Sequence, residues 1–399
     1  MRRLCAALGD PQRRFSSIHV AGSKGKGSTC AFCEAILRAH GLRTGLYTSP
    51  HLVDFRERIR VGGEKIPPSS FAELVPDVKR AIESLPDGAN VTFFELYTAL
   101  AFLYFARCNV DLAVCEVGMG GRLDATNVLE PRVTVITPIS EEHTRYLGAT
   151  VEEIAREKAA IVKPSVPAVV NARRGTEVVL AQCARVGARA FLYEKDFSAR
   201  REEEGTVALR LGEREFRGVK LGLRGWFQVE NGACAAMAAS LALGGKLEEP
   251  ALSEGLARVR WPGRFQVVGQ EPAFVLDGAM NGESAQALRR ALAEEFPGRP
   301  LCFVYGASAD KDVRATLRAL LDERTAALVL TQAQNPRALP VDELRAQVEF
   351  AGEVRCAPTV AQALSLAREL LPEGGVVCVT GSLYVVGEAL DALGALEEE

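Results

Sequence analysis

Residues 16–29, which read SSIHVAGSKGKGST, constrain the fold of this chain more than any other stretch. Ile18 and Val20 alternate with smaller or polar neighbours, as in a short strand, and residues 29–41 predict an apolar-faced helix that ends at Gly41. A strand, a glycine-rich turn and a helix in this order are typical of a phosphate-binding loop. We therefore expect an α/β nucleotide-binding domain. An ordinary glycine-rich turn is the alternative.

The residues of this turn suit a polyphosphate. Gly22, Gly25 and Gly27 let the backbone turn its amides inward, and the start of the following helix adds a partial positive charge. Lys26 would reach the terminal phosphates, and the Ser28 hydroxyl would face a magnesium ion. The string departs from the strict GxxxxGK[ST] pattern, because Gly27 stands between the lysine and the serine.

Composition narrows the class of protein. At 399 residues, with 48% hydrophobic and 25% charged content, the chain is long enough for two or three domains. The net charge is -3 and the basic residues are spread throughout, so we expect no nucleic-acid and no membrane partner. No apolar run approaches the ~18 residues of a membrane span, and residues 1–14 do not resemble a secretion signal. We expect a cytoplasmic monomer that acts on a small charged substrate.

Ten cysteines are scattered without a regular framework, which favours reduced thiols. Cys30 and Cys33 form a CxxC, but no second pair or nearby histidine completes a zinc site. We interpret them as two packed thiols on the helix after the phosphate loop.

Polar residues that could hold magnesium follow several predicted strands. Ser49 lies in a Ser-Pro-His loop after a short strand; it is either a simple turn residue or a magnesium and substrate contact. Glu116 lies near the end of an apolar strand at 112–117, where an acidic residue completes the magnesium site of phosphate-loop enzymes. His143 follows a further strand, at the edge where ligand sites of open α/β sheets collect.

Two predicted helices carry further candidates. Residues 91–108 predict a buried helix, and Glu95 in its first turn is either a favourable charge at the helix start or a substrate contact. Thr150 and Glu153 form a capping box that opens a helix expected to stop at Pro164. Lys158 on this helix would ordinarily be a solvated charge.

Alternating strands and helices predict an α/β architecture in two parts. Residues 1–264 form the phosphate-loop domain, with an irregular or antiparallel stretch at 190–220. Residues 265–399 form a smaller Rossmann-like α/β domain whose strands are near-continuously apolar, as in buried parallel sheets. The Trp-Pro-Gly at 261–263 predicts a stiff joint, and an active site between the domains would close by hinge motion.

The order of the motifs resembles one family over essentially the whole chain. Folylpolyglutamate synthase and the bifunctional dihydrofolate synthase, of the Mur ligase superfamily, share the succession VAGSKGKGST, YTSPHL with FRERI, EVGMGGRLDATN, EEHTRYLG and IAREKAAIVKP. The match continues with WFQVEN, WPGR, LDGAMN, YGASADKD and VTGSLYVVGE. The resemblance implies a Mur-ligase-like fold. It also implies an enzyme that uses ATP and magnesium, with two ions expected, to join L-glutamate to a folate or dihydropteroate carboxylate through an acyl phosphate.

The resemblance also implies roles for individual residues. The expected ATP contacts are Gly22, Ser23, Lys24, Gly25, Lys26, Gly27, Ser28, Asn231, Arg264 and Asp277. The expected metal ligands are Ser28, Ser49, Glu116, His143 and Lys158, the last as a carbamate formed with carbon dioxide. Lys26, Glu116, His143 and Lys158 would be catalytic. The pterin substrate would contact Thr92, Phe93, Phe94, Glu95, Leu123, Asp124 and Ala125.

Three positions depart from the family pattern. Phe227 replaces the histidine before Gln228, Glu142 replaces the usual aspartate before His143, and Met280 replaces a histidine. These changes leave two alternatives open. One is a diverged Mur-superfamily ligase that acts on another acidic metabolite, and the other is a nucleotide-binding paralogue with weakened turnover.

Overall fold

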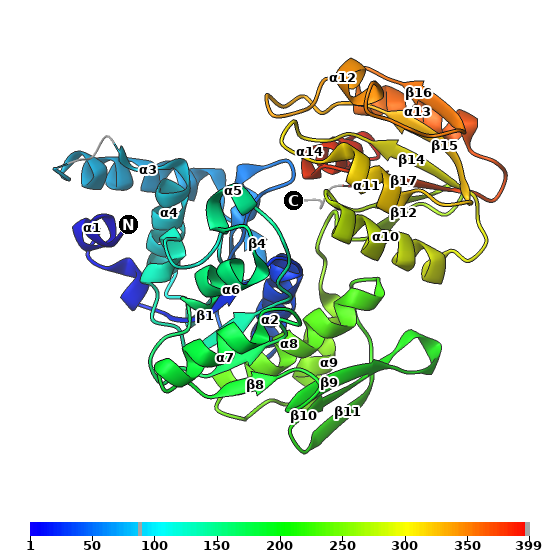
Figure 1. Cartoon of the computed structure of the whole chain (residues 1–399). Helices are drawn as coiled ribbons and strands as arrows, with labels where there is room; N and C mark the ends of the chain where they lie inside the picture. Colours follow the sequence, from blue (N-terminus) through cyan, green and yellow to red (C-terminus); the bar gives the residue numbers. More distant parts are fainter. Residues whose placement is uncertain (87–89, 396–399) are drawn as a thin grey trace. The chain divides into compact units, whose positions relative to one another are not determined.

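A computed structural model describes residues 1–86 and 90–395 of the chain (Figure 1). These residues form two compact units. The first unit comprises residues 1–222 and 227–260, and the second comprises residues 223–226 and the chain from Trp261 onward. The predicted domain boundary after residue 264 lies close to the point between Arg260 and Trp261 where the chain passes from the first unit into the second.

The first unit is built on an eight-stranded sheet in the order β4-β3-β2-β5-β1-β6-β7-β8. Strands β2, β5, β1, β6, β7 and β8 are parallel, and β3 and β4 form an antiparallel hairpin at one edge. The strands are β1 (Ser16–Ala21), β2 (Thr44–Tyr47), β3 (Ile59–Val61), β4 (Glu64–Lys65), β5 (Leu112–Glu116), β6 (Val133–Ile136), β7 (Ala168–Val170) and β8 (Ala190–Leu192). The central strand β1 leads directly into the glycine-rich turn, so the turn lies at the carboxyl edge of the sheet.

Helices cover this sheet, because its parallel strands are apolar on both faces. The helices of the unit are α1 (Arg2–Ala7), α2 (Lys26–Ala39), α3 (Pro68–Glu83), α4 (Phe93–Arg107), α5 (Thr144–Leu147), α6 (Val151–Ala159), α7 (Thr176–Arg185), α8 (Trp226–Ala242) and α9 (Glu249–Arg258). Short 3₁₀ turns include η1 (Pro11–Arg13), η2 (Phe55–Arg58), η4 (Ala125–Val128) and η5 (Glu203–Gly205). Helix α2 packs on β1, β2 and β5 and against α9.

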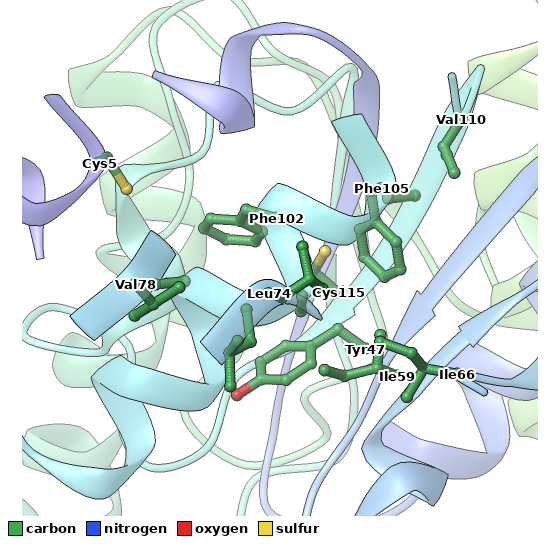
Figure 2. Close-up of a cluster of buried hydrophobic side chains, with 14 of the residues drawn as sticks. Cys5, Tyr47, Ile59, Ile66, Leu74, Val78, Phe102, Phe105, Val110 and Cys115 are labelled. Atoms are coloured by element: carbon green, nitrogen blue, oxygen red, sulfur yellow. The ribbon is translucent and has the colours of Figure 1, made fainter. Parts of the chain in front are cut away.

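A cluster of buried apolar side chains joins α4 to the sheet (Figure 2). Phe102 and Phe105 of α4 pack with Tyr47 of β2, Ile59 of β3 and Cys115 of β5, all with no exposed surface. Deleting a buried phenylalanine ring commonly costs about 3–5 kcal/mol of folding stability. The cluster therefore holds α4, whose first turn carries predicted substrate contacts, against the sheet.

The antiparallel stretch predicted at 190–220 is present in the first unit. Strands β9 (Phe197–Arg201), β10 (Val207–Leu211) and β11 (Arg214–Val219) form a three-stranded antiparallel sheet. The helix expected to stop at Pro164 instead ends at Ala159, and the next residues make tight turns through Ile161 N to Lys158 O and Val162 N to Ala159 O. The helix therefore ends before Pro164 can act, since a proline restricts the residue directly before it, which is Lys163.

The second unit is a six-stranded sheet in the order β12-β13-β17-β14-β15-β16. All strands are parallel except β12, which pairs antiparallel with β13. Its strands are β12 (Gln266–Val268), β13 (Ala273–Leu276), β14 (Leu301–Tyr305), β15 (Thr325–Leu330), β16 (Glu353–Cys356) and β17 (Val376–Thr380). Its helices are α10 (Gly282–Glu295), α11 (Val313–Leu320), α12 (Val341–Arg345), α13 (Val360–Leu370) and α14 (Leu383–Ala392).

The predictions about the cysteines and about membrane-spanning segments can be compared with the described residues. Cys30 and Cys33 are free thiols with no exposed surface, on α2, as predicted. Their pKa values are raised by burial, which makes them poor nucleophiles. Over residues 1–86 and 90–395, none of the helices combines the length and apolar character needed to cross a bilayer.

Candidate active site

The glycine-rich turn closes around two neighbouring segments. Gly25, the residue before α2, has φ +78°, and a Cβ there would overlap the side-chain amide of Asn231 on α8. A Cβ on Gly22 would overlap the hydroxyl of Thr137, which follows β6. Both positions therefore require glycine. L side chains rarely adopt the left-handed conformation of Gly25, and neither position has room for a methyl group.

The amides of the turn divide into two groups. Those of Ser23 and Lys24 donate to the carbonyl of Pro138, at 2.8 and 3.2 Å, so they are used inside the protein. The Ser23 hydroxyl also exchanges hydrogen bonds with the backbone of Ser140, both at 3.0 Å. The first amides of α2, from Lys26 on, have no carbonyl partner within the helix and form the positive end of its dipole. An anion is therefore expected at the start of α2.

Helix α8 reaches the same place. Gln228 and Asn231 lie one turn apart on α8, and Asn231 Nδ2 donates to Gln228 Oε1 at 2.9 Å. Gln228 Nε2 in turn donates to the hydroxyl of Ser28 at 3.3 Å. The fold thus brings the predicted ATP contact Asn231 beside the phosphate loop, about 200 residues away in sequence.

The other two predicted ATP contacts belong to the second unit. Asp277 follows β13 and is buried; its carboxylate accepts the amides of Phe265 and Ala279, both at 2.9 Å. Arg264 donates to the carbonyl of Gly263 at 3.2 Å. In this structure both side chains therefore stabilise the backbone of their own unit.

Ser49 and Glu116 meet at the ends of adjacent strands. Glu116 is the last residue of β5 and is 5% exposed, and its Oε2 accepts the amide of Ser49 at 2.9 Å. His143 follows β6 and precedes α5 in a left-handed conformation, with φ 48°. Three of the five predicted magnesium ligands therefore lie at the end of β5 or in the segments that follow β2 and β6, while Ser28 and Lys158 lie on α2 and α6.

The chemistry of these donors fits magnesium only in part. Among the described residues, three or more His, Cys, Asp or Glu side chains nowhere gather into a cluster that would hold a metal ion. The predicted set has one carboxylate on Glu116, the hydroxyls of Ser28 and Ser49, and the imidazole of His143. Magnesium is usually held by one or two carboxylates, with phosphate oxygens and water completing the octahedron. The donors therefore suit an ion that arrives with a nucleotide.

Lys158 is buried, with 1% of its surface exposed, so it is not a solvated helix charge. Its Nζ donates to Glu142 Oε1 at 2.7 Å and to the carbonyl of Gly22 at 2.8 Å. Burial lowers the pKa of Lys158 to about 8, against the opposing charge of Glu142. Burial alone would raise the pKa of Glu142, but Lys26, Lys158 and Lys24 hold it below its ordinary value.

Of the predicted pterin contacts, two present apolar side chains to solvent. Phe93 is 59% exposed and Leu123 is 80% exposed. Phe94 packs against Gly118, where a Cβ would overlap its ring, and Ala125 is buried. The start of α4 and the loop after β5 therefore lie against each other.

The polar members of this set already bind other groups of the protein, and Glu95 Oε1 also accepts from the amino terminus of Met1 at 3.0 Å. Thr92 and Glu95 form the capping box of α4, with the Glu95 carboxylate accepting the Thr92 amide at 3.0 Å and the Thr92 hydroxyl at 2.9 Å. Asp124 binds backbone within its own loop, by accepting the amides of Gly118 and Met119 at 3.0 and 3.1 Å. Burial raises the pKa of Asp124, although the hydrogen bonds oppose this.

Among the exposed large apolar side chains, sequence reasoning identified Phe93 and Leu123 and missed the others. Seven large ones are exposed among the described residues: Val53, Phe55, Val75, Phe93, Met119, Leu123 and Tyr146. All except Val75 lie after β2, β5 or β6, or at the start of α4. Phe55 and Tyr146 occur within the FRERI and EEHTRYLG motifs, on η2 and α5. An aromatic residue soon after a predicted strand was the signal that could have identified them. Glu142 was noted only as a departure.

The geometry defines a phosphate-loop protein with a second α/β unit, and two family models cover it accordingly. Residues 20–239 match the Mur ligase middle domain, and residues 263–383 match the Mur ligase glutamate ligase domain. A dihydrofolate synthase/folylpolyglutamate synthase of Bacillus subtilis is 33% identical, with 97% of this chain and 93% of the relative covered. The chain therefore belongs to the Mur ligase family, in its group of folylpolyglutamate and dihydrofolate synthases.

Another relative is longer than this chain. A probable bifunctional folylpolyglutamate synthase/dihydropteroate synthase of Haloferax volcanii is 40% identical over 98% of this chain, but the chain spans only 47% of its length. The chain thus covers about half of that relative.

Solved structures share the fold over almost the whole chain. Mycobacterium tuberculosis folylpolyglutamate synthase complexed with ADP and AMPPCP has a TM-score of 0.93 at 34% identity, covering 98% of this chain and 94% of that one. The Escherichia coli relative complexed with DHPP and ADP has a TM-score of 0.89 at 28% identity. A bifunctional folylpolyglutamate synthase/dihydrofolate synthase with Mn, AMPPNP and L-glutamate bound has a TM-score of 0.86 at 30% identity. These cover 99% and 98% of this chain, and 93% of each relative.

Proposed function

We propose that the chain is an ATP-dependent amide ligase that adds L-glutamate to a folate or dihydropteroate carboxylate. The observation that carries the proposal is the meeting of the phosphate loop with Glu116 and Ser49 at one edge of the sheet, bordered by exposed Phe93 and Leu123. A nucleotide site beside exposed apolar side chains suits a substrate with a flat ring system and an acidic end. The ligands of the Escherichia coli and Mn-bound relatives agree with this substrate class.

ATP is placed first by the phosphate loop. The amides at the start of α2 and the Lys26 side chain would neutralise the terminal phosphates, while Asn231 lies beside the turn that holds them. Gly25 allows the backbone to approach closely, since a side chain there would displace Asn231. These contacts orient the γ-phosphoryl group toward the edge of the sheet.

Magnesium, when bound with the nucleotide, would polarise the γ-phosphoryl oxygens and reduce their repulsion of an incoming carboxylate. Ser28, Ser49, Glu116 and His143 are the residues that would hold it. Glu116 is preorganised for this by the Ser49 amide, which fixes one of its oxygens at 2.9 Å.

The ligation then proceeds in two transfers. The substrate carboxylate attacks the γ-phosphorus and ADP leaves, which gives an acyl phosphate. The amine of L-glutamate attacks the acyl carbon, loses a proton, and expels inorganic phosphate as the amide forms. The side chains position and neutralise these groups, and none of them is needed as a nucleophile.

Lys158 is proposed to act as a carbamate, formed when its neutral amine adds carbon dioxide and releases a proton. The pKa of about 8 leaves a substantial neutral fraction at physiological pH. A carbamate would place a second negative charge beside Glu142, so this state requires a bound cation. The modification and the metal are thus expected to stabilise each other.

The test is phosphate release from ATP, measured with and without L-glutamate across dihydropteroate, tetrahydrofolate and acidic cell-wall precursors. Release that needs glutamate and a pterin carboxylate together supports the proposal. Release only with a cell-wall precursor would indicate another Mur-type ligase, and nucleotide binding without release would indicate a degenerate paralogue. The cytoplasmic location and the monomeric state stay predictions.

A further inference from the structure

The central strand β1 carries a histidine where its neighbours are apolar. His19 has no exposed surface and lies level with Cys115 of β5 and Thr134 of β6. Its side chain contacts the turn η4, where Nε2 lies 2.7 Å from the hydroxyl of Thr126. The two residues are 107 positions apart in sequence.

Thr126 links this histidine to Asp124. The Thr126 hydroxyl donates to Asp124 Oδ1 at 2.5 Å, and the Thr126 amide donates to the same oxygen at 3.0 Å. Asp124 Oδ2 accepts the amides of Gly118 and Met119. All four of these groups donate hydrogen bonds to Asp124, so its carboxylate is in the ionised form, which only accepts.

This arrangement fixes the tautomer of His19. A threonine hydroxyl has one proton, and in Thr126 this proton is donated in the hydrogen bond to the Asp124 carboxylate. The hydroxyl must therefore accept from His19, which places the imidazole proton on Nε2. Nδ1 is then a bare acceptor, and over the described residues it is buried without a hydrogen-bond partner.

An unpaired buried nitrogen lowers stability, so packing alone does not explain a histidine at this position. The imidazole donates a hydrogen bond to the Thr126 hydroxyl, which an apolar side chain at this position could not do. Through Thr126 and Asp124 that donor is linked to the amides of Gly118 and Met119, two and three residues after the proposed metal ligand Glu116. The strand that holds His19 also leads into the phosphate loop.

We propose that His19 is a positioning residue that, through Thr126 and Asp124, holds the loop at 118–124 in a fixed place relative to the phosphate loop. The loop presents Met119 and Leu123 to solvent, so its position determines how the acidic substrate meets the nucleotide. This inference rests on the proposed function for its kinetic consequence, but not for its structural one.

Further hydrogen bonds hold the loop at 118–124 in place. The Asn127 side chain donates to the carbonyl of Arg122 at 3.1 Å and accepts from Lys163 Nζ at 2.7 Å. Arg122 is bound to Glu157 of α6 through its amide and its guanidinium, both at 2.9 Å. These contacts hold the far side of the loop, and His19 with Thr126 holds the side that faces β1.

The test compares matched variants. Thr126→Val removes the link at nearly constant side-chain size, and His19→Phe removes it with a somewhat larger apolar ring. Thr126→Ser and His19→Gln each keep a group able to continue the link. Ile18→Val, on the same strand, is the control for a general loss of packing. The first readout is hydrogen–deuterium exchange of the Gly118 and Met119 amides in the whole chain, and it needs no substrate.

We expect faster exchange of these two amides in Thr126→Val and His19→Phe, and wild-type exchange in Thr126→Ser and Ile18→Val. In the ligase assay, KM for the pterin carboxylate should rise roughly tenfold in the first pair, with KM for ATP within about twofold of wild type. His19→Gln should recover most of the loss.

Unchanged exchange at Gly118 and Met119 in Thr126→Val would overturn the proposal, whatever the substrate proves to be. Equal changes in both KM values would also overturn it, since a general disturbance of the site would explain them. If wild-type protein shows no ligation, the proposed function fails, and the exchange result still decides the role of His19.

Discussion

Lys158 and Glu142 form a buried ion pair in which Nζ lies 2.7 Å from Oε1, and the same nitrogen donates to the Gly22 carbonyl at 2.8 Å. The pair thereby joins α6 to the first residue of the glycine-rich turn. A change of charge on Nζ therefore acts directly on the turn that leads into α2, where the phosphates are proposed to bind.

Activity should depend on carbon dioxide. Because the pKa of Lys158 is about 8, the neutral amine that forms a carbamate increases as pH rises through 8. Bicarbonate should therefore stimulate ligation more at pH 8.5 than at pH 7, and only with magnesium present. Lys158→Ala should lose about a hundredfold or more in kcat, as loss of a preorganised transition-state contact commonly does, with partial recovery on adding short carboxylic acids.

Lys79→Ala is the control for this experiment, since Lys79 is an exposed lysine on α3. Full activity of wild-type protein after thorough removal of carbon dioxide would count against the carbamate.

Glu142→Gln should destabilise the fold, because it leaves the Lys158 ammonium buried without its carboxylate. Breaking a buried pair in this way costs about 3 kcal/mol or more. Without Glu142 the pKa of Lys158 falls further below its unfolded value, so the unfolded state binds more protons and stability rises with pH. The difference from wild type in urea unfolding should therefore shrink between pH 6 and pH 8.

Glu142→Asp keeps the charge and introduces the aspartate that the family resemblance implies at this position, so it should retain most of the stability. A Glu142→Gln variant as stable as wild type at pH 6 would show that the pair does not hold the loop.

His19 should make the first unit sensitive to acid. Burial, helped by the charge of Lys163, lowers the pKa of His19 to about 3, against an unfolded value of 6.5. Between these values the unfolded state binds the extra proton, so stability falls as pH drops below 6.5, by roughly 1.4 kcal/mol per pH unit. His19→Phe should lose this contribution, which a comparison of urea midpoints at pH 7.5 and pH 5 would measure. Equal acid sensitivity of the two proteins would contradict the neutral, buried imidazole.

Met280→His should increase turnover. Met280 follows β13, where the resemblance places a histidine, and a thioether cannot donate a hydrogen bond to a phosphate oxygen. One such donor in a preorganised site is commonly worth about a hundredfold in rate. We expect a rise in kcat with little change in KM for ATP, and no gain from Met280→Leu. If Met280→His is no faster, another group performs this role or the chemistry has changed.

The phosphate loop and the capping box of Thr150 and Glu153 were predictable because each signal lies within a few adjacent residues. The burial of Lys158 was not predictable from its helix, because Glu142 and the Gly22 carbonyl come from two other segments. The same reason applies to the Ser23 and Lys24 amides, which sequence reasoning assigned to phosphate and the fold directs to Pro138.

Strand β16 shows a further limit of periodicity. Its residues Glu353–Cys356 are mostly exposed at the edge of the second sheet, so they lack the apolar run that identified the central strands. The link from His19 to Thr126 joins residues that only strand pairing brings together. Periodicity and turn motifs therefore predicted most of the elements, and the family resemblance supplied most of the candidate residues. The contacts that set the charge and position of these residues required the structure.

The central claim, ligation through an acyl phosphate, is tested most directly with a pterin substrate whose carboxylate carries ¹⁸O. In the proposed reaction a carboxylate oxygen bonds to the γ-phosphorus and leaves with it when glutamate attacks. The released inorganic phosphate should therefore contain one ¹⁸O atom per turnover, and Lys26→Ala should release none, because the charge that holds the terminal phosphates is gone. Glutamate-dependent amide formation with unlabelled phosphate, or with AMP and pyrophosphate as products, would contradict the account.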